Sequence, residues 1–305
     1  MRKILKCGCT IQFGVKMGAS ARTAALMVVL TVFFLVIGYA IGWWVGNVTL
    51  ILTIAFIFAI TLNIFTYWYA DKWVLKLYKA KLVSEAEEPE LHEIVGRLAT
   101  NAGLPKPRVA IVPSDKPNAF ATGRNPSHAV VAVTKGAMSL LDKEQLEGVL
   151  GHEMAHVRNR DMLVNTMAAM IAGAIAYVGM IGQYSLIFGG RRDRGGGAML
   201  LALLAIILVP LAAMLVRLSI SRTREYGADE EGTKISRKPR ALASALRALE
   251  SAAKSRPMQT GSPATSHLFI VNPFRGASFV EMLSTHPSTE KRIQRLEEMA
   301  ATGKF

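Results

Sequence analysis

Residues 23–70 have the sequence TAALMVVLTVFFLVIGYAIGWWVGNVTLILTIAFIFAITLNIFTYWYA and contain no Asp, Glu, Lys, Arg or His. As one helix this run would be about 70 Å long, more than twice the ~30 Å hydrocarbon core of a bilayer. It must therefore fold back, and the turn-forming pair Gly46-Asn47, preceded by two tryptophans, is the expected reversal. We expect two membrane spans, at about 24–45 and 48–69. A buried core helix would show a polar face, and a signal peptide would be shorter.

A second pair of uncharged stretches follows at about 162–188 and 198–216, separated by the arginine-containing loop 191–197. Polar residues in the first stretch and a proline in the second make these weaker candidates, so the pair could instead form a partial hairpin or a cavity wall. If they form the second transmembrane pair, residues 162–220 cross the membrane twice and end on the same side as residue 161. Residues 71–161 and 221–305 then lie on one side of the membrane and can share one soluble domain.

The charge distribution sets the direction of these spans. The 305-residue chain has 36 Lys and Arg against 22 Asp and Glu, a formal charge of +14, although 51% of its residues are hydrophobic. This composition excludes a disordered chain, and two cysteines exclude a disulfide scaffold. Residues 1–22 carry five basic and no acidic side chains, and four lysines follow the first hairpin, so both ends of this hairpin should face the cytoplasm. Because the positive charge lies at the ends of the spans, a nucleic-acid partner is not required. Cys7 and Cys9 could bind metal or carry a lipid, but we expect free thiols in a reducing compartment.

The soluble parts predict a mainly helical domain with a small sheet. Two short apolar runs, Arg108–Val112 and Ala129–Thr134, predict strands, and the turn-forming segment 117–126 between them suggests an antiparallel sheet. A helix should begin at Asp142, an N-cap followed three residues later by Gln145. Apolar periodicity predicts the other helices, at 85–103, 221–233, 239–253 and 288–299, and residues 255–278 are expected to form a loop or lid. The expected fold is an α-helical membrane protein with a mainly α, α+β domain.

The pentapeptide His152-Glu153-Met154-Ala155-His156 is a candidate catalytic metal site. In a helix, the two histidines lie one turn apart on one face and can both bind one Zn²⁺ at about 2.0–2.1 Å. Glu153 then lies beside the metal, where it can take a proton from an activated water and hand it to a leaving amine. Because the H-E-x-x-H pattern fixes only three positions, it also arises by chance.

A catalytic zinc site takes three protein ligands, so a third ligand is needed. Glu225 is a better candidate than the cysteines or the other histidines, because it follows the fourth apolar stretch directly. Asp229 lies one helical turn further along the same face and could accept a hydrogen bond from a ligand imidazole. Both carboxylates could equally belong to a solvated helix face.

Four motifs together resemble the HtpX family of membrane zinc metallopeptidases, relatives of the CAAX prenyl endopeptidases. The motifs are Asn118–Gly123, Gly151–His156, Ser221–Asp229 and Ser284–Pro287. The resemblance covers roughly residues 25–300 and implies a gluzincin-type zinc metallopeptidase domain. It also implies one Zn²⁺ per chain held by His152, His156 and Glu225, with Glu153 as general base and Asp229 orienting a ligand histidine.

The same resemblance implies that Ala129–Thr134 is the active-site edge strand, which pairs with the extended backbone of a substrate. Specificity would then be broad, toward unfolded or misassembled membrane proteins in stress-related quality control. Asn118 could hold a substrate carbonyl or cap a turn. His286 could stabilise an oxyanion, occupy the open position on zinc, or be structural. The basic segment 1–22 looks longer than this family usually has.

The sequence therefore predicts a multi-pass zinc endopeptidase of the cell membrane, with its N-terminus and catalytic domain in the cytoplasm and with protein substrates and the bilayer as partners. The alternative is a catalytically silent, zinc-binding membrane scaffold, but a purely structural zinc site has no use for Glu153. A small transporter would need ionisable residues inside its spans, and these spans have almost none.

Overall fold

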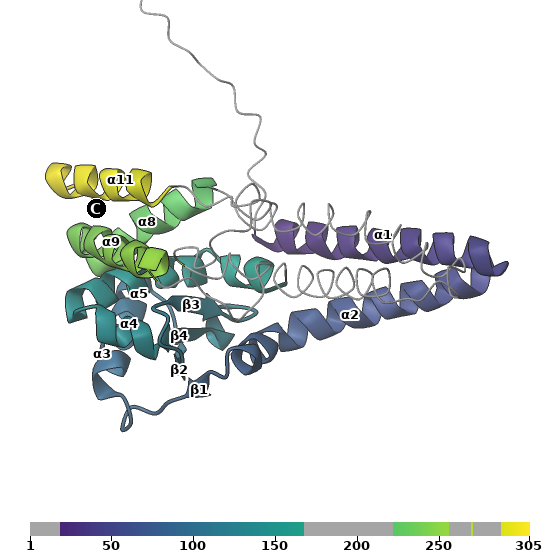
Figure 1. The fold of residues 1–305 in the computed structure, drawn as a ribbon, viewed down its shortest axis with the longest axis horizontal. Coiled ribbons are helices and arrows are strands. Elements are labelled where there is room, and N and C mark those ends of the chain that lie inside the picture. Colours follow the sequence, from purple (N-terminus) through teal and green to yellow (C-terminus); the bar gives the residue numbers. More distant parts are fainter. Residues whose placement is uncertain (1–18, 168–221, 256–269, 271–287) are drawn as a thin grey trace, which may run out of the picture.

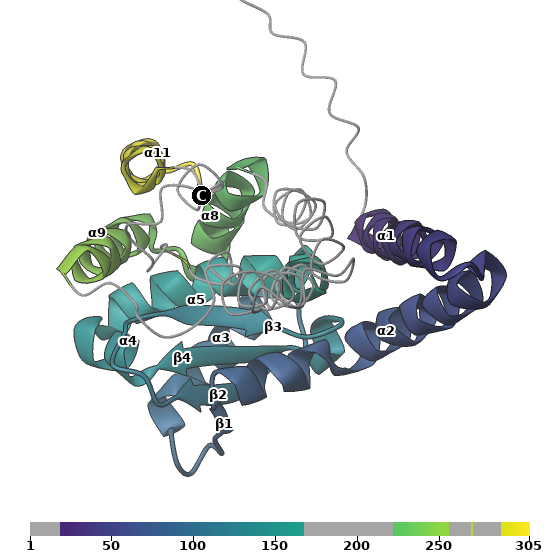
Figure 2. The same cartoon turned by 45° about the vertical axis from the view of Figure 1, so that its right-hand side comes forward.

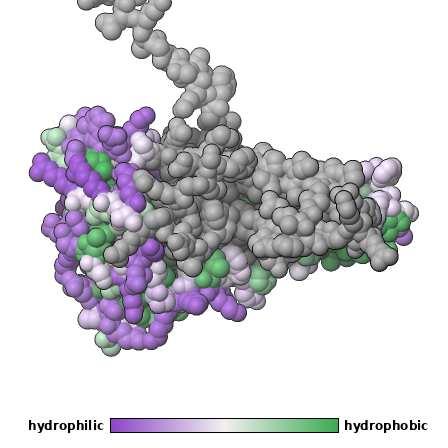
Figure 3. Space-filling view, in the orientation of Figure 1, coloured by the Kyte–Doolittle hydropathy of each residue, from purple (hydrophilic) through white to green (hydrophobic). Residues whose placement is uncertain are grey.

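The computed structural model describes residues 19–167, 222–255, 270 and 288–305. A long helical hairpin projects from one side of a domain that holds a small sheet and several helices (Figure 1). Hydrophilic residues dominate the part of the domain surface that is visible in Figure 3. Most of residues 162–220, Cys7, Cys9, most of the predicted loop 255–278 and His286 lie outside the described residues.

The hairpin consists of α1 (Ala19–Val45) and α2 (Val48–Leu77). The reversal predicted between them is confirmed: Gly46 has a φ of 83°, and the Asn47 side chain accepts a hydrogen bond from the first turn of α2. Their apolar stretches, Thr23–Val45 and Val48–Tyr69, are long enough to cross a bilayer.

Most large apolar side chains of the hairpin face outward, and Trp43 near its tip is 74% exposed. The helices of a soluble core would bury these side chains, so their exposure fits a lipid environment. The two helices touch through small residues. A Cβ added at Gly38 would lie 2.5 Å from the Cβ of Ala55, which is the close approach that small residues allow in membrane helix pairs.

Four strands form one mixed sheet in the order β1-β2-β4-β3. Their bounds are Lys81–Leu82 for β1, Arg108–Val112 for β2, Ala119–Thr122 for β3 and Val130–Thr134 for β4. The predicted fold class is confirmed, but the wholly antiparallel sheet is wrong, because β2 and β4 pair in parallel. The segment expected to be only a turn contains β3, which reverses the chain once more and returns β4 in the direction of β2.

Both faces of the sheet are covered (Figure 2). Side chains alternate between them: Val131 and Val133 of β4 face the helical layer, whereas Val130 and Ala132 pack toward the end of α2 near Val74. This two-sided burial explains why β4 is an almost continuous apolar run. The hairpin therefore leads directly into the face of the sheet opposite the helices.

The helical layer confirms the predicted helices to within a few residues. Its members are α3 (Pro89–Ala102), α4 (Lys135–Leu140), α5 (Lys143–Arg158), α8 (Arg222–Ser236), α9 (Pro239–Ser255) and α11 (Thr289–Thr302). A further helix begins at Asp161, and its described part ends at Met167. Asp142 and Gln145 form the predicted capping box at the start of α5.

Two glycines bring α5 and α8 into close contact. A Cβ on Gly151 would lie 2.8 Å from the carbonyl oxygen of Gly232, and a Cβ on Gly232 would lie 2.7 Å from the backbone nitrogen of His152. Any larger side chain at either position would push the helices apart. The close contact between the two helices places the acidic residues of α8 beside the histidines of α5.

Candidate metal centre

Three buried side chains from two helices converge at one point. His152 and His156 come from α5 and Glu225 comes from α8, and their ligand atoms all lie within 4.8 Å of one another. His152 Nε2 is 3.8 Å from Glu225 Oε2, and His156 Nε2 is 3.7 Å from Glu225 Oε1. Ligand atoms about 3.3 Å apart would surround a tetrahedral zinc ion, so the two histidine–Glu225 pairs would need to close by about 0.5 Å to hold one. Two imidazoles and one carboxylate are also a donor set of catalytic zinc centres, so the residues present fit this metal.

Each histidine has a carboxylate near its Nδ1 atom, on the side of the ring away from Glu225. Asp229 Oδ1 lies 3.0 Å from His152 Nδ1, which fixes the ring with Nε2 toward Glu225. Asp161, which we did not predict as a site residue, places Oδ2 3.6 Å from His156 Nδ1. That distance is too long for a direct hydrogen bond, and His156 Nδ1 has no such partner among the described residues. Asp161 therefore acts on His156 through its charge.

Arg292 of α11 is the site residue that sequence reasoning missed most clearly. It is 2% exposed, and its Nε and Nη2 donate to both oxygens of Asp229 at 2.8 and 2.7 Å. Its Nη1 lies 3.8 Å from Glu225 Oε2. Its signal is its spacing, since Arg292 lies four residues before Leu296, on the apolar stripe itself.

Among the described residues, Ile270 links Arg292 to Asn118 at the start of the sheet. Its carbonyl oxygen accepts from Arg292 Nη1 at 3.0 Å, and its N–H donates to Asn118 Oδ1 at 3.3 Å. Asn118 is itself buried just before β3. The structure therefore gives its side chain a backbone partner at Ile270, and the predicted contact with a substrate carbonyl stays a prediction.

Glu153 lies on α5 beside the cluster and is 5% exposed. Burial raises the pKa of its carboxyl to about 7, although nearby His156 and a hydrogen bond from the backbone N–H of Ala121 lower it. A carboxyl group with this pKa can both accept and release a proton near neutral pH.

The two histidines have different proton affinities. Burial lowers the pKa of His152, although the carboxylate of Asp229 opposes this shift. Burial also lowers the pKa of His156, but the carboxylates of Asp161, Glu225 and Glu153 outweigh it and raise the pKa to about 9. Without a metal, His156 therefore carries a proton at neutral pH.

The strand next to this cluster is β3, not β4. Of the described strands, β4 lies between β2 and β3, so the expectation that Ala129–Thr134 is the edge strand is wrong. The strongest β signal in the sequence belongs to β4 because this strand is buried on both faces, whereas β3 is Ala-Phe-Ala-Thr between turn residues.

Strand β3 turns main-chain groups toward the site. The N–H of Thr134 donates to the carbonyl oxygen of Asn118 at 2.9 Å, and the N–H of Asn118 donates to Thr134 Oγ1 at 2.8 Å, so these two opposite residues form a hydrogen-bonded pair. Because such pairs alternate in an antiparallel ladder, the N–H and C=O groups of Ala119 and Ala121 point away from β4. The hydrogen bond from Ala121 to Glu153 agrees with this direction.

An apolar helical hairpin joined to an α+β domain, in which H-E-x-x-H on one helix meets a carboxylate from another, defines a membrane metallopeptidase. The sequence model of Peptidase family M48 matches residues 85–300. The chain belongs to this family, whose members are metal-dependent peptidases that act on proteins.

Curated relatives agree over nearly the whole length. The protease HtpX homolog of Pyrococcus furiosus is 55% identical over 93% of this chain and 96% of its own length. Those of Thermococcus sibiricus and Salinibacter ruber are each 52% identical, over 93% and 92% of this chain and 97% of their own. The predicted resemblance is thereby confirmed. A solved structure, Ste24p of S. mikatae, aligns with a TM-score of 0.49 and 18% identity over 90% of this chain and 65% of its own.

Proposed function

We propose that this protein is a multi-pass membrane zinc endopeptidase that cleaves unfolded or misassembled membrane proteins at the cytoplasmic surface, as part of protein quality control. The observation that carries the proposal is the buried cluster of His152, His156 and Glu225 with Glu153 beside it. Basic residues at the domain end of the hairpin support the cytoplasmic side. Residues 162–220 supply the second transmembrane pair in this proposal.

The roles follow from the contacts. The two histidines and Glu225 would hold a zinc ion, which would supply polarisation of the scissile carbonyl and activation of a water molecule. Glu153 takes the proton of the attacking water and delivers it to the leaving amine. Asp229 holds the ring of His152, and Arg292 balances the charge of Asp229 in the buried site.

Substrate binding uses the outward groups of Ala119 and Ala121. An extended segment adds to the open side of β3 through main-chain hydrogen bonds, which give affinity with little side-chain selectivity. The hairpin supports a membrane-linked substrate pool, because α2 runs from its apolar stretch directly into the sheet. Unfolded segments next to the membrane are therefore the substrates that this site favours.

Metal binding should depend on pH as well as on the three ligands. We expect one zinc ion per purified chain, and cleavage of an unfolded protein should stop when a chelator removes it. A metal must displace the proton of His156 below pH 9, so zinc affinity should fall about ten-fold for each pH unit from 9 to 7. Competition with a chelator of known affinity at pH 7, 8 and 9 measures this.

A histidine with an ordinary pKa would give a nearly constant affinity over that range, which would contradict the charge balance described here. Zinc that binds without any chelator-sensitive cleavage would favour the scaffold alternative.

Pairing with β3 predicts a two-residue pattern in the substrate. Methylating single backbone nitrogens of a cleaved peptide, other than the scissile one, should lower kcat/KM about five-fold where the N–H faces β3. The neighbouring amides, which face away, serve as matched controls because they carry the same methyl group without losing a bond to the strand. Equal effects at all positions would contradict strand addition.

A further inference from the structure

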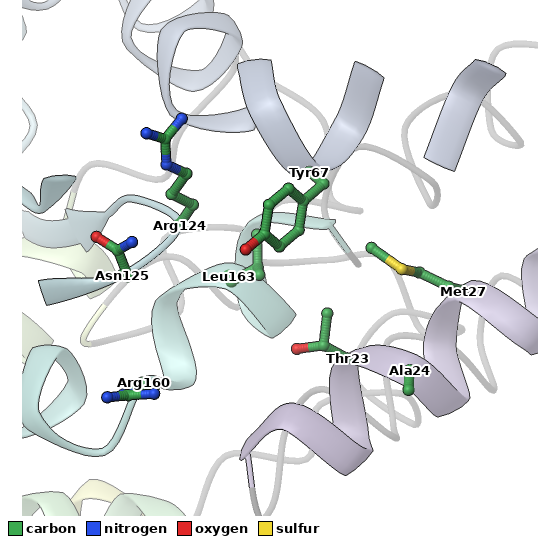
Figure 4. A pocket seen from close by; sticks show the side chains of 8 residues that line it. All are labelled: Thr23, Ala24, Met27, Tyr67, Arg124, Asn125, Arg160 and Leu163. Atoms are coloured by element: carbon green, nitrogen blue, oxygen red, sulfur yellow. The ribbon is translucent and has the colours of Figure 1, made fainter. Parts of the chain in front are cut away.

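A cavity lies at the base of the hairpin, and its described lining includes none of the three candidate metal ligands. Its volume is about 340 Å³, within the range of small-molecule sites. Figure 4 shows side chains from the hairpin on one side and from the domain on the other. The described lining residues are Thr23, Ala24, Met27, Tyr67, Arg124, Asn125, Arg160 and Leu163.

The lining is basic and rich in hydrogen-bond donors. Arg124 and Arg160 supply two guanidinium groups, and no acidic side chain is among the described lining residues. In Figure 4 the hydroxyl group of Tyr67 points into the cavity, and the amide nitrogen of Asn125 turns the same way. Met27 and Leu163 add apolar surface beside these donors. The cavity therefore has a cationic side and an apolar side.

Arg124 is held in place without losing its charge. Its guanidinium stacks 4.4 Å above the ring of Trp68, and its Nη2 lies 2.7 Å from His128 Nε2. His128 Nδ1 is 2.8 Å from Asn125 Oδ1, so a neutral ring protonated on Nδ1 satisfies both contacts. These partners orient the arginine but do not neutralise it.

Arg160 occupies the turn after α5 and is exposed. Its φ is 56°, a left-handed conformation that glycine or asparagine adopts at lower cost. Within the described residues its guanidinium forms no ion pair with a carboxylate. A cation without a carboxylate partner among the described residues is therefore kept at a backbone position that does not favour it.

The cavity lies at the level where the apolar stretches end. The apolar stretch in α1 begins at Thr23, which lines the cavity. The apolar stretch in α2 ends at Tyr69, two residues after the lining residue Tyr67. Tyr67, Trp68 and Tyr69 form the aromatic cluster that is typical of the headgroup level of a bilayer. At that height the phosphate groups of lipids are the most abundant anions.

We propose that this cavity binds the phosphate of an anionic glycerophospholipid, with Arg124 and Arg160 as the cationic ligands and an acyl chain against Met27 and Leu163. Basic pockets between membrane helices recognise anionic headgroups in this way. The cavity is also connected to two elements of the candidate metal centre. Arg124 follows β3 after one residue, and Arg160 follows α5 after one residue, so a bound lipid would join the hairpin to both.

The test is a lipid titration of the purified, zinc-loaded full chain in a neutral detergent, followed by native mass spectrometry. Phosphatidylglycerol should be retained about 25-fold more tightly than phosphatidylcholine with the same acyl chains, at about five-fold for each guanidinium. In the double variant Arg124→Gln/Arg160→Gln this preference should disappear. Arg240→Gln/Lys135→Gln is the matched control, because it removes the same charge from exposed sites away from the cavity.

Each outcome decides the proposal. Equal retention of the two lipids by the native chain, or an unchanged preference in the glutamine variant, overturns it. If inorganic phosphate displaces the lipid at equal concentration, the site binds small anions and the lipid assignment is wrong. Should the glutamine variant fail to fold, Arg124→Lys/Arg160→Lys keeps both charges and must retain the preference. Because no substrate is present, none of these results depends on the proposed peptidase function.

Discussion

Replacing Glu153 by glutamine should lower peptide cleavage about a thousandfold while one zinc ion per chain stays bound. Glutamine has almost the same shape, and its side-chain oxygen can still accept the hydrogen bond from Ala121. It cannot take a proton from the attacking water at neutral pH. Cleavage of an unfolded protein and metal content should be measured on the same preparation, so that loss of activity is separated from loss of metal.

Glu147 offers a matched control on the same helix. It is also buried, 4% exposed, but it pairs with Arg97 at 3.0 Å and Lys238 at 3.1 Å, outside the cluster. Glu147→Gln should leave the cleavage rate close to that of the unaltered chain, although the variant protein should be less stable. If Glu153→Gln cleaves at the native rate, Glu153 is not the general base. If both variants lose activity equally, the effect of Glu153→Gln is structural.

Local signals in the sequence predicted the parts of the fold that depend on local physics. The hairpin follows from an uncharged run too long for one helix, and its reversal lies where Gly46 can adopt a positive φ. The start of α5 follows from the capping box at Asp142. The two histidines lie together because a helix alone places residues i and i+4 on one face.

What the sequence did not predict depends on distant contacts. Strand β3 is short and weakly β-forming, so only its pairing with β4 defines it and makes it the strand beside Glu153. Asp161 follows a turn, and Arg292 comes 136 residues after His156. A buried charged side chain is stable only if an oppositely charged partner is present. A local sequence pattern cannot identify such a partner when it lies on another helix.

Replacing Arg292 by methionine should destabilise the full chain by about 3–5 kcal/mol and weaken zinc binding. Methionine keeps the apolar length of the side chain but leaves the carboxylate of Asp229 buried without its countercharge. Burial alone would raise the pKa of Asp229, but Arg292, followed by His152, outweighs burial and holds the pKa below its usual value. Without the arginine, Asp229 should take up a proton and hold His152 less firmly. Pulse proteolysis in detergent measures the stability, and chelator competition measures the zinc affinity.

Arg295 lies three residues further along α11 and supplies the control. It is exposed and stacks 4.3 Å from the ring of Tyr226, so Arg295→Met should cost no more than about 1 kcal/mol and leave zinc affinity unchanged. The double variant Arg292→Met/Asp229→Asn removes both charges, and it should therefore be more stable than Arg292→Met alone. If the two substitutions are additive, Arg292 serves only to pack α11 and does not balance the charge behind His152.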